Sequence, residues 1–113
     1  MSHRVVITGM GIYSCIGTSL EAVRDALYEG KSGLIFDPER KAYGYRSALT
    51  GFVPAPELKG VLGRRERISM GEESEYAYMA TTEALSQARI DPDFLKAQEV
   101  GILYGNDSVA ESV

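Results

Sequence analysis

Two short runs of aliphatic residues lie near opposite ends of the chain, and each run is closed by a glycine. Residues 5–8 (VVIT) precede Gly9, and residues 100–104 (VGILY) precede Gly105. A short apolar run bounded by turn residues is typical of a strand buried on both faces, as in a parallel sheet. The sequence therefore predicts two buried strands, at 5–8 and at 100–104.

The segment between the first glycines and residue 30 has the signals of a helix with defined ends. Thr18 and Glu21 have the spacing of a capping box, so we predict that the helix begins at Ser19. Gly30 follows the last apolar position and is a typical C-cap, because glycine readily adopts the left-handed conformation.

Residues 72–89 form the strongest helical segment, because they contain neither glycine nor proline. Small side chains share one face of this segment, at Ala77, Ala80, Ala84 and Ala88. Because such a stripe lets another backbone approach closely, we expect this helix to lie inside a layered domain. The Asp-Pro pair at 91 and 92 predicts a short helix through Lys96.

The region 31–63 is rich in glycine and proline, and within it we predict only short strands, at Leu34–Phe36 and Leu49–Val53. The order strand, helix, irregular region, helix, strand favours an α/β domain with parallel pairing. Two such strands do not make a sheet that is stable alone in water. We therefore interpret residues 1–113 as an incomplete domain.

Composition and charge argue against several classes of protein function. The chain has 113 residues, 44% hydrophobic and 25% charged, which is the average makeup of one globular domain. Its net charge of −4 argues against a nucleic-acid-binding domain. No apolar run reaches the roughly 18 residues of a membrane span, and the N-terminus lacks a signal peptide's apolar region. We expect a cytoplasmic protein that binds neither nucleic acid nor membrane.

The residues that could carry chemistry are few. One Cys and one His cannot form an internal disulfide or a Cys/His zinc site, so we expect no metal. Gly9-Met10-Gly11 lacks the third glycine of a dinucleotide-binding fingerprint, because that position is Ser14, and we interpret it as a close-packed turn without a cofactor. Cys15 is a possible nucleophile, but a lone Cys without a neighbouring base is more often a small buried residue.

Four cations stand close together before the alanine-striped helix and are offset by a single acid, Glu66. We call them the basic segment, which consists of Lys59, Arg64, Arg65 and Arg67. One interpretation is a solvated start of a helix. The other is a docking surface for an acidic partner or a phosphate. Composition alone leaves both open.

Several spaced motifs together resemble the N-terminus of a β-ketoacyl-acyl-carrier-protein synthase. They are Arg4–Gly11 (RVVITGMG), Ser14–Gly17 (SCIG), Glu29–Gly33 (EGKSG) and Val100–Gly105 (VGILYG). The tract Arg46–Gly51 and the Arg64-Arg65 pair resemble the elongating enzymes of fatty-acid synthesis. The resemblance extends over essentially the whole chain.

The resemblance implies a thiolase-like fold, a five-layer α-β-α-β-α sandwich, of which residues 1–113 would be the first part of the N-terminal domain. It also implies a decarboxylative Claisen condensation between an acyl thioester and malonyl-acyl carrier protein. That chemistry requires an activated Cys and two His. In the family these residues lie later in a longer chain, so we assign no catalytic residue here and expect this chain alone to be inactive.

The resemblance further implies particular site residues. Relatives place basic residues at the positions of Arg64 and Arg65, which implies carrier-protein docking there, with Arg67 nearby. Relatives have a further basic residue where this chain has Ile68. The residue aligned with Ser108 borders the acyl pocket in relatives. The family also implies a homodimer, and exposed strand edges would make the isolated chain self-associate.

Two other interpretations stay open. The family's glycine-rich loop is replaced here by Gly105-Asn106-Asp107. This difference is compatible with a second hypothesis, a catalytically silent partner subunit of the chain-length-factor type. A structural module that packs through its alanine stripe is the third possibility. A Cys in a Thr-Ala-Cys-like turn and two later His in the parent gene would favour the enzyme.

Overall fold

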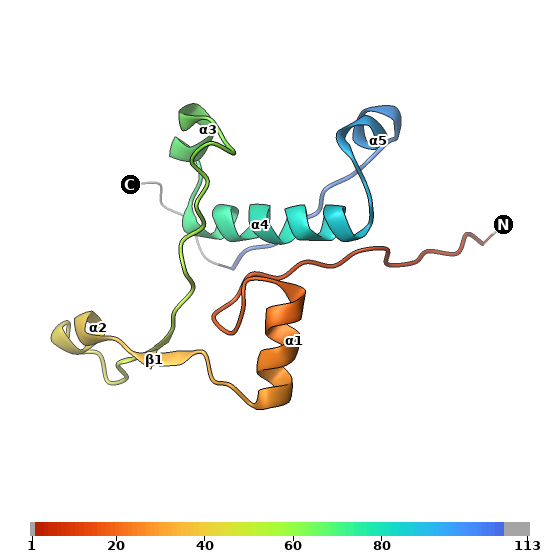
Figure 1. The fold of residues 1–113 in the computed structure, drawn as a ribbon. Coiled ribbons are helices and arrows are strands. Elements are labelled where there is room, and N and C mark those ends of the chain that lie inside the picture. Colours follow the sequence, from red (N-terminus) through yellow and green to blue (C-terminus); the bar gives the residue numbers. More distant parts are fainter. Residues whose placement is uncertain (1, 108–113) are drawn as a thin grey trace.

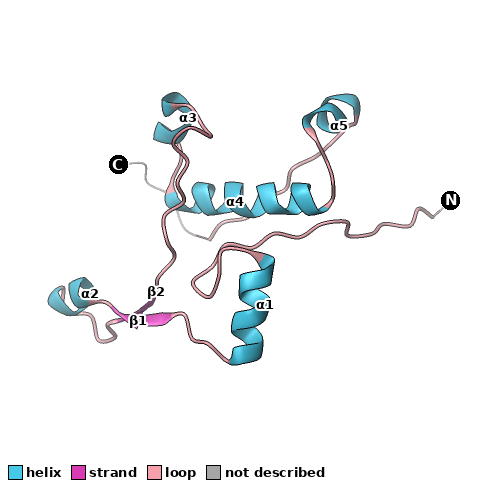
Figure 2. Cartoon of the chain, viewed as in Figure 1, coloured by secondary structure: helices cyan, strands magenta, loops and turns pink. Residues whose placement is uncertain are grey.

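The structure is a computed structural model that describes residues 2–107 (Figure 1). Its helices and strands, in chain order, are α1 (Leu20–Glu29), β1 (Leu34–Phe36), α2 (Pro38–Ala42), β2 (Leu49–Gly51), α3 (Arg64–Ile68), α4 (Glu72–Gln87) and α5 (Pro92–Ala97). Long loops join them, as Figure 2 shows. Helices with a small sheet agree with the predicted α/β class.

The described part of the chain is open rather than compact. Its radius of gyration is 17.4 Å, whereas a compact domain of this length would have about 13 Å. Helix α4 lies in the centre, the N-terminal segment runs beside it, and α3 and α5 project from its two ends (Figure 1). Among the described residues, only Val23, Ala26 and Leu58 are buried. No single core therefore holds the elements together.

Helix α1 has the predicted ends, but its cap is one residue later than the capping box suggests. The Ser19 hydroxyl accepts a hydrogen bond from the Ala22 N–H at 3.2 Å, so Ser19 rather than Thr18 is the N-cap. Ser19 has extended backbone dihedrals, which an N-cap requires. Gly30 ends the helix with φ 67°, as predicted.

The sheet differs from the predicted one in its strands and in its direction. Strands β1 and β2 pair antiparallel, with Ile35 opposite Thr50, and they confirm the two short strands predicted in the irregular region. In the described chain no other strand joins them. β2 ends at Gly51, two residues before the predicted end.

The runs 5–8 and 100–104 are extended but form no strand in the described structure, so the predicted parallel pairing is wrong there. Val5 is 91% exposed and Leu103 is fully exposed. A strand exists only when another backbone pairs with its edge, and nothing within residues 2–107 does so for either run. Both runs are hydrophobic, but the segments that would bury their side chains are not among the described residues.

Helix α4 begins where predicted and ends earlier, at Gln87 instead of Arg89. Arg89 adopts φ 57°, a left-handed conformation that a helix cannot continue through. The following helix α5 confirms the Asp-Pro prediction, because the Asp91 carboxylate accepts a hydrogen bond from the Phe94 N–H at 2.8 Å. None of the helices in residues 2–107 has the length and apolarity needed to cross a membrane.

Candidate functional site

The basic segment is organised around the short helix α3. Its N-cap, Gly63, has no side chain to cap the helix, and the Glu66 carboxylate instead accepts a hydrogen bond from the Gly63 N–H at 2.6 Å. A carboxylate in the first turn also interacts favourably with the helix dipole. The single acid among the arginines is therefore engaged at the helix start.

The three arginines of α3 do not have the same surroundings. Arg64 and Arg65 are exposed. Arg67 is half-buried, and its Nε donates a hydrogen bond to the Leu62 carbonyl oxygen at 3.3 Å. Within residues 2–107, no carboxylate forms an ion pair with these arginines or with Lys59. Arg64 and Arg65 thus keep their hydrogen-bonding capacity for a partner, while Arg67 partly serves its own loop.

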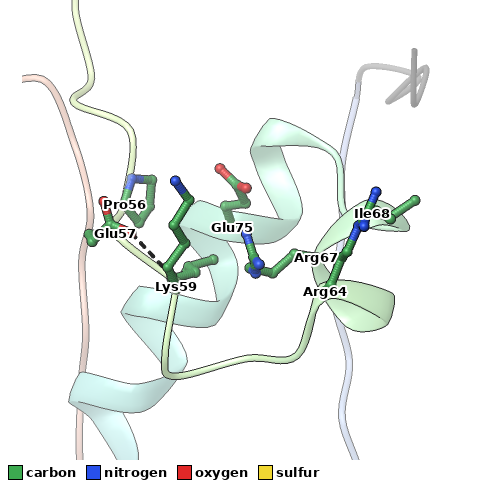
Figure 3. Close-up of a pocket in the computed structure, with 8 residues that line it drawn as sticks. Pro56, Glu57, Lys59, Arg64, Arg67, Ile68 and Glu75 are labelled. Atoms are coloured by element: carbon green, nitrogen blue, oxygen red, sulfur yellow. Dashed lines mark hydrogen bonds between the residues drawn. The ribbon is translucent and has the colours of Figure 1, made fainter.

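A cleft of about 430 Å³ separates α3 from the loop before it (Figure 3). Its walls are formed by Pro56, Glu57, Leu58, Lys59, Arg64, Arg67, Ile68 and Glu75. Leu58 is buried, and Lys59 faces the cleft from the side opposite Arg64. The structure therefore brings three members of the basic segment, Lys59, Arg64 and Arg67, to one cleft, and Arg65 lies beside it on α3.

The exposed guanidinium groups of this arrangement are suited to binding an anionic surface. Guanidinium groups recognise carboxylates and phosphates in bidentate geometry, and they remain charged at any physiological pH. The cleft lining contains no Ser, Cys or His, and its two carboxylates, Glu57 and Glu75, leave one net positive charge against its three cations. Among the described residues, no group of three or more His, Cys, Asp or Glu is placed to hold a metal ion.

Cys15 has the surroundings of a packing residue. It lies in a tight turn closed by hydrogen bonds between Ser14 and Gly17, and it is half-buried. A Cβ added at Gly33 would lie 2.6 Å from the Cys15 Sγ, and one at Gly51 would lie 3.1 Å away. Two glycines thus pack against the thiol, which supports the interpretation as a small packed side chain.

The Gly9-Met10-Gly11 turn packs directly on α4, as a close-packed turn should. A Cβ at Gly9 would lie 2.2 Å from the Ala84 carbonyl oxygen, and one at Gly11 would lie 1.8 Å from that of Ala80. The alanine stripe and the two glycines are therefore complementary surfaces. The predicted close approach of another backbone to this helix is confirmed.

Two polar residues of α4 hold the same turn, and the sequence analysis missed both. The Gln87 amide oxygen accepts a hydrogen bond from the Met10 N–H at 2.8 Å. The Glu83 carboxylate accepts one from Ile12 at 3.0 Å and another from Leu20 at 2.7 Å. Their i, i+4 spacing beside the alanine stripe is the one sequence signal that could have found them.

A tyrosine pair joins the N-terminal segment to α4. Tyr13 and Tyr76 stack with ring centroids 5.6 Å apart, and the Tyr13 hydroxyl donates a hydrogen bond to the Pro54 carbonyl oxygen at 2.8 Å. The pKa of Tyr76 is raised to about 12. The larger cause is burial of the side chain, and the next is the nearby Glu72 carboxylate. No periodic pattern in the sequence indicates that Tyr13 and Tyr76 would be in contact.

The segment after α5 returns along α4. The Tyr104 hydroxyl donates a hydrogen bond to the Glu73 carbonyl oxygen at 3.3 Å, near the start of α4. The predicted pocket residue Ser108 lies outside the described residues. Asp107 is the last residue that the structure describes.

Comparison with known proteins gives one family and a consistent set of relatives. The family model described as "Beta-ketoacyl synthase, N-terminal domain" matches residues 2–112. The chain is 36% identical over 105 residues to 3-oxoacyl-[acyl-carrier-protein] synthase 1 of Buchnera aphidicola (subsp. Acyrthosiphon pisum), covering 92% of this chain and 26% of that protein.

The synthase 1 of Escherichia coli K12 is 35% identical over 91% of this chain and 25% of its own length. The 3-oxoacyl-[acyl-carrier-protein] synthase 2 of Vibrio harveyi is 27% identical over 92% of this chain and 25% of its own. The chain thus spans about a quarter of the length of these curated relatives.

Proposed function

This chain belongs to the β-ketoacyl synthase family, and on that premise we propose that it is the N-terminal part of a 3-oxoacyl-[acyl-carrier-protein] synthase. In this reaction an enzyme Cys thiolate attacks the carrier-protein thioester and takes the acyl group, and the thiolate of the carrier protein leaves. Malonyl-carrier protein then loses carbon dioxide, and its carbanion attacks the acyl carbonyl carbon. The new carbon–carbon bond forms as the Cys thiolate leaves. Two relatives named as synthase 1, each above 30% identity, support the proposal.

Within that enzyme, the role of this chain is to dock the acidic carrier protein through Arg64 and Arg65, with Arg67 in support. The observation that carries this role is the hydrogen bond between Glu66 and Gly63, which engages the only acid among the arginines. Both guanidinium groups are exposed and have no ion-pair partner within residues 2–107. Exposed cations of this kind steer an acidic partner and raise its association rate.

The thiolase-like layering is part of the same proposal. In such a fold the runs 5–8 and 100–104 would be strands of a sheet covered on both faces. Their apolar side chains are exposed in the described chain, with Ile7 at 82% and Ile102 at 89%. Sheet neighbours and a covering layer supplied by the rest of the protein would bury both. A cytoplasmic homodimer, with Ser108 at the border of the acyl pocket, completes the proposal.

The test is a double charge reversal, Arg64→Glu with Arg65→Glu, in the full-length enzyme. We expect KM for acyl-carrier protein to rise severalfold or more, and turnover of acyl-CoA to stay unchanged because the chemistry lies elsewhere. Lys41→Glu with Lys96→Glu is the matched control, since it changes the net charge equally at two other exposed positions. Unaltered carrier-protein kinetics at low salt would reduce the basic segment to a solvated surface.

Assays on the same full-length protein distinguish the hypothesis of an active enzyme from that of a silent partner subunit. The departure at Asn106 and Asp107 from the family's glycine-rich loop is the observation that favours the silent subunit. Condensing activity by the purified protein alone establishes the enzyme. Binding of carrier protein without condensation, restored by adding a second ketosynthase-like chain, would establish the partner subunit.

A further inference from the structure

An isoleucine stands where the docking surface would be most expected to carry charge. Ile68 is the last residue of α3 and is 66% exposed. It lines the same cleft as Arg64 and Arg67 (Figure 3). Single exposed aliphatic residues are common on protein surfaces, so the neighbours of Ile68 decide what its exposure means.

Those neighbours are the two docking arginines. On a helix, residues three and four positions apart lie on the same face, and the residues three and four before Ile68 are Arg65 and Arg64. Figure 3 shows Arg64 and Ile68 next to one another at one edge of the cleft. The other residues that line the cleft are Pro56, Glu57, Leu58, Lys59, Arg67 and Glu75. Leu58 is 4% exposed and offers a partner little surface.

This surface has the anatomy of a protein–protein contact. Binding sites commonly combine an apolar centre, which gains affinity by losing water, with a charged rim that gives orientation and specificity. Here Ile68 supplies the apolar centre, and Arg64 and Arg65 supply the rim. A bare phosphate or another small anion would use the guanidinium groups and leave the aliphatic side chain in water.

We propose that Ile68 is an apolar anchor for the partner that Arg64 and Arg65 attract. The complementary partner surface carries carboxylates beside an apolar side chain. The inference rests on the proposed function, since it takes that partner to be the acyl carrier protein. Attraction by the arginines sets the association rate, whereas the contact made by Ile68 slows dissociation. Ile68 is therefore a specificity-determining residue of the docking site and has no part in the chemistry.

The experiment measures binding of holo-acyl carrier protein from the same genome to the full-length protein, as a function of salt. Ile68→Ser should weaken binding roughly tenfold, through faster dissociation, and leave the slope of log Kd against log salt unchanged. Arg64→Glu should instead change that slope. Ile68→Met, which keeps an apolar side chain of similar size, should bind like the wild type.

Ile68→Lys is the decisive variant, because the two accounts of this surface predict opposite signs. If only charge matters, an added cation strengthens binding of an acidic partner. If Ile68 is an anchor, the lysine weakens binding at moderate salt despite the added charge. Leu27→Ser is the matched control, since Leu27 is 68% exposed on α1, away from the cleft.

Each outcome decides the matter. Tighter binding by Ile68→Lys, or wild-type affinity in Ile68→Ser, overturns the anchor while the docking role of the arginines stands. Absence of carrier binding by the wild-type protein overturns the anchor and the docking role together. A fall in Tm for Ile68→Ser beyond that for Leu27→Ser also overturns the anchor, because Ile68 would then be covered in the folded protein.

Discussion

The carboxylate of Glu83 accepts a hydrogen bond from the backbone N–H of Leu20 at 2.7 Å, across 63 residues of sequence. Leu20 is the first residue of α1, so its N–H has no partner within the helix. The other oxygen of the same carboxylate accepts the Ile12 N–H. One side chain of α4 thus caps α1 and also holds the N-terminal segment, in a structure where few of the described residues are buried.

Loss of this carboxylate should destabilise the protein clearly. Glu83→Ala leaves two backbone donors without their acceptor, and we expect a loss of about 2 kcal/mol in the free energy of unfolding, since hydrogen bonds to charged groups contribute about 1.5–3 kcal/mol. Glu83→Gln keeps one acceptor oxygen and should lose less. Urea unfolding measures both, with exposed Glu99→Ala as the control. Equal stability of Glu83→Ala and Glu99→Ala would contradict the assigned role.

The contact between the glycine turn and α4 should not tolerate a single methyl group. Gly11→Ala would place a Cβ 1.8 Å from the Ala80 carbonyl oxygen, so the two segments must separate. We expect a loss at the upper end of the roughly 1–3 kcal/mol of overpacked sites. The wild-type full-length protein is the reference. Thermal unfolding compares them, and matching Tm values would show that the turn is not packed on α4.

Tyr76 should make stability fall at alkaline pH. Its pKa in the folded protein is about 12, above the ordinary value of 10.0. The folded state therefore holds this proton more tightly, and the resulting stability is complete below pH 10 and is lost as the pH rises toward about 12. Tyr76→Phe should flatten that part of the profile. The prediction would be refuted if Tyr76→Phe left the pH profile of stability unchanged. It would also be refuted if tyrosinate absorbance showed that the variant still has the late-titrating group.

The 113-residue chain on its own should not catalyse condensation. The reaction requires an activated Cys and two His, whereas the chain has one His and a single Cys, against which two glycines pack. The purified chain should release no carbon dioxide from malonyl-carrier protein in the presence of an acyl thioester. Measurable condensation product, absent when Cys15 is changed to Ser, would disprove this and make Cys15 a nucleophile.

The same isolated chain should self-associate. Val5, Val6, Ile7, Ile102 and Leu103 are each at least 68% exposed in extended segments whose edges are unpaired within residues 2–107. Exposed apolar edges of this kind pair with other chains. Light scattering at micromolar concentration should show species larger than a monomer, and Ile7→Lys with Leu103→Lys should reduce them. A monodisperse monomer with a sharp thermal transition would contradict the expectation.

The sequence by itself determined the features that depend on neighbours along the chain. Helix caps such as Gly30 and Asp91, the alanine stripe of α4 and the short strands β1 and β2 follow from local conformational preference and from periodicity. The family motifs are likewise linear patterns. The basic segment was recognisable in the sequence as a cluster of cations. The sequence did not show whether these cations form ion pairs with carboxylates.

Only the tertiary structure decided which distant groups meet. Glu83 and Leu20, or Tyr13 and Tyr76, have no relation in sequence, because each contact depends on how two elements are oriented in space. The same holds for the runs 5–8 and 100–104. Hydrophobicity predicts that a segment will be buried if a partner is present, but pairing is a property of two backbones, and one sequence segment cannot specify both.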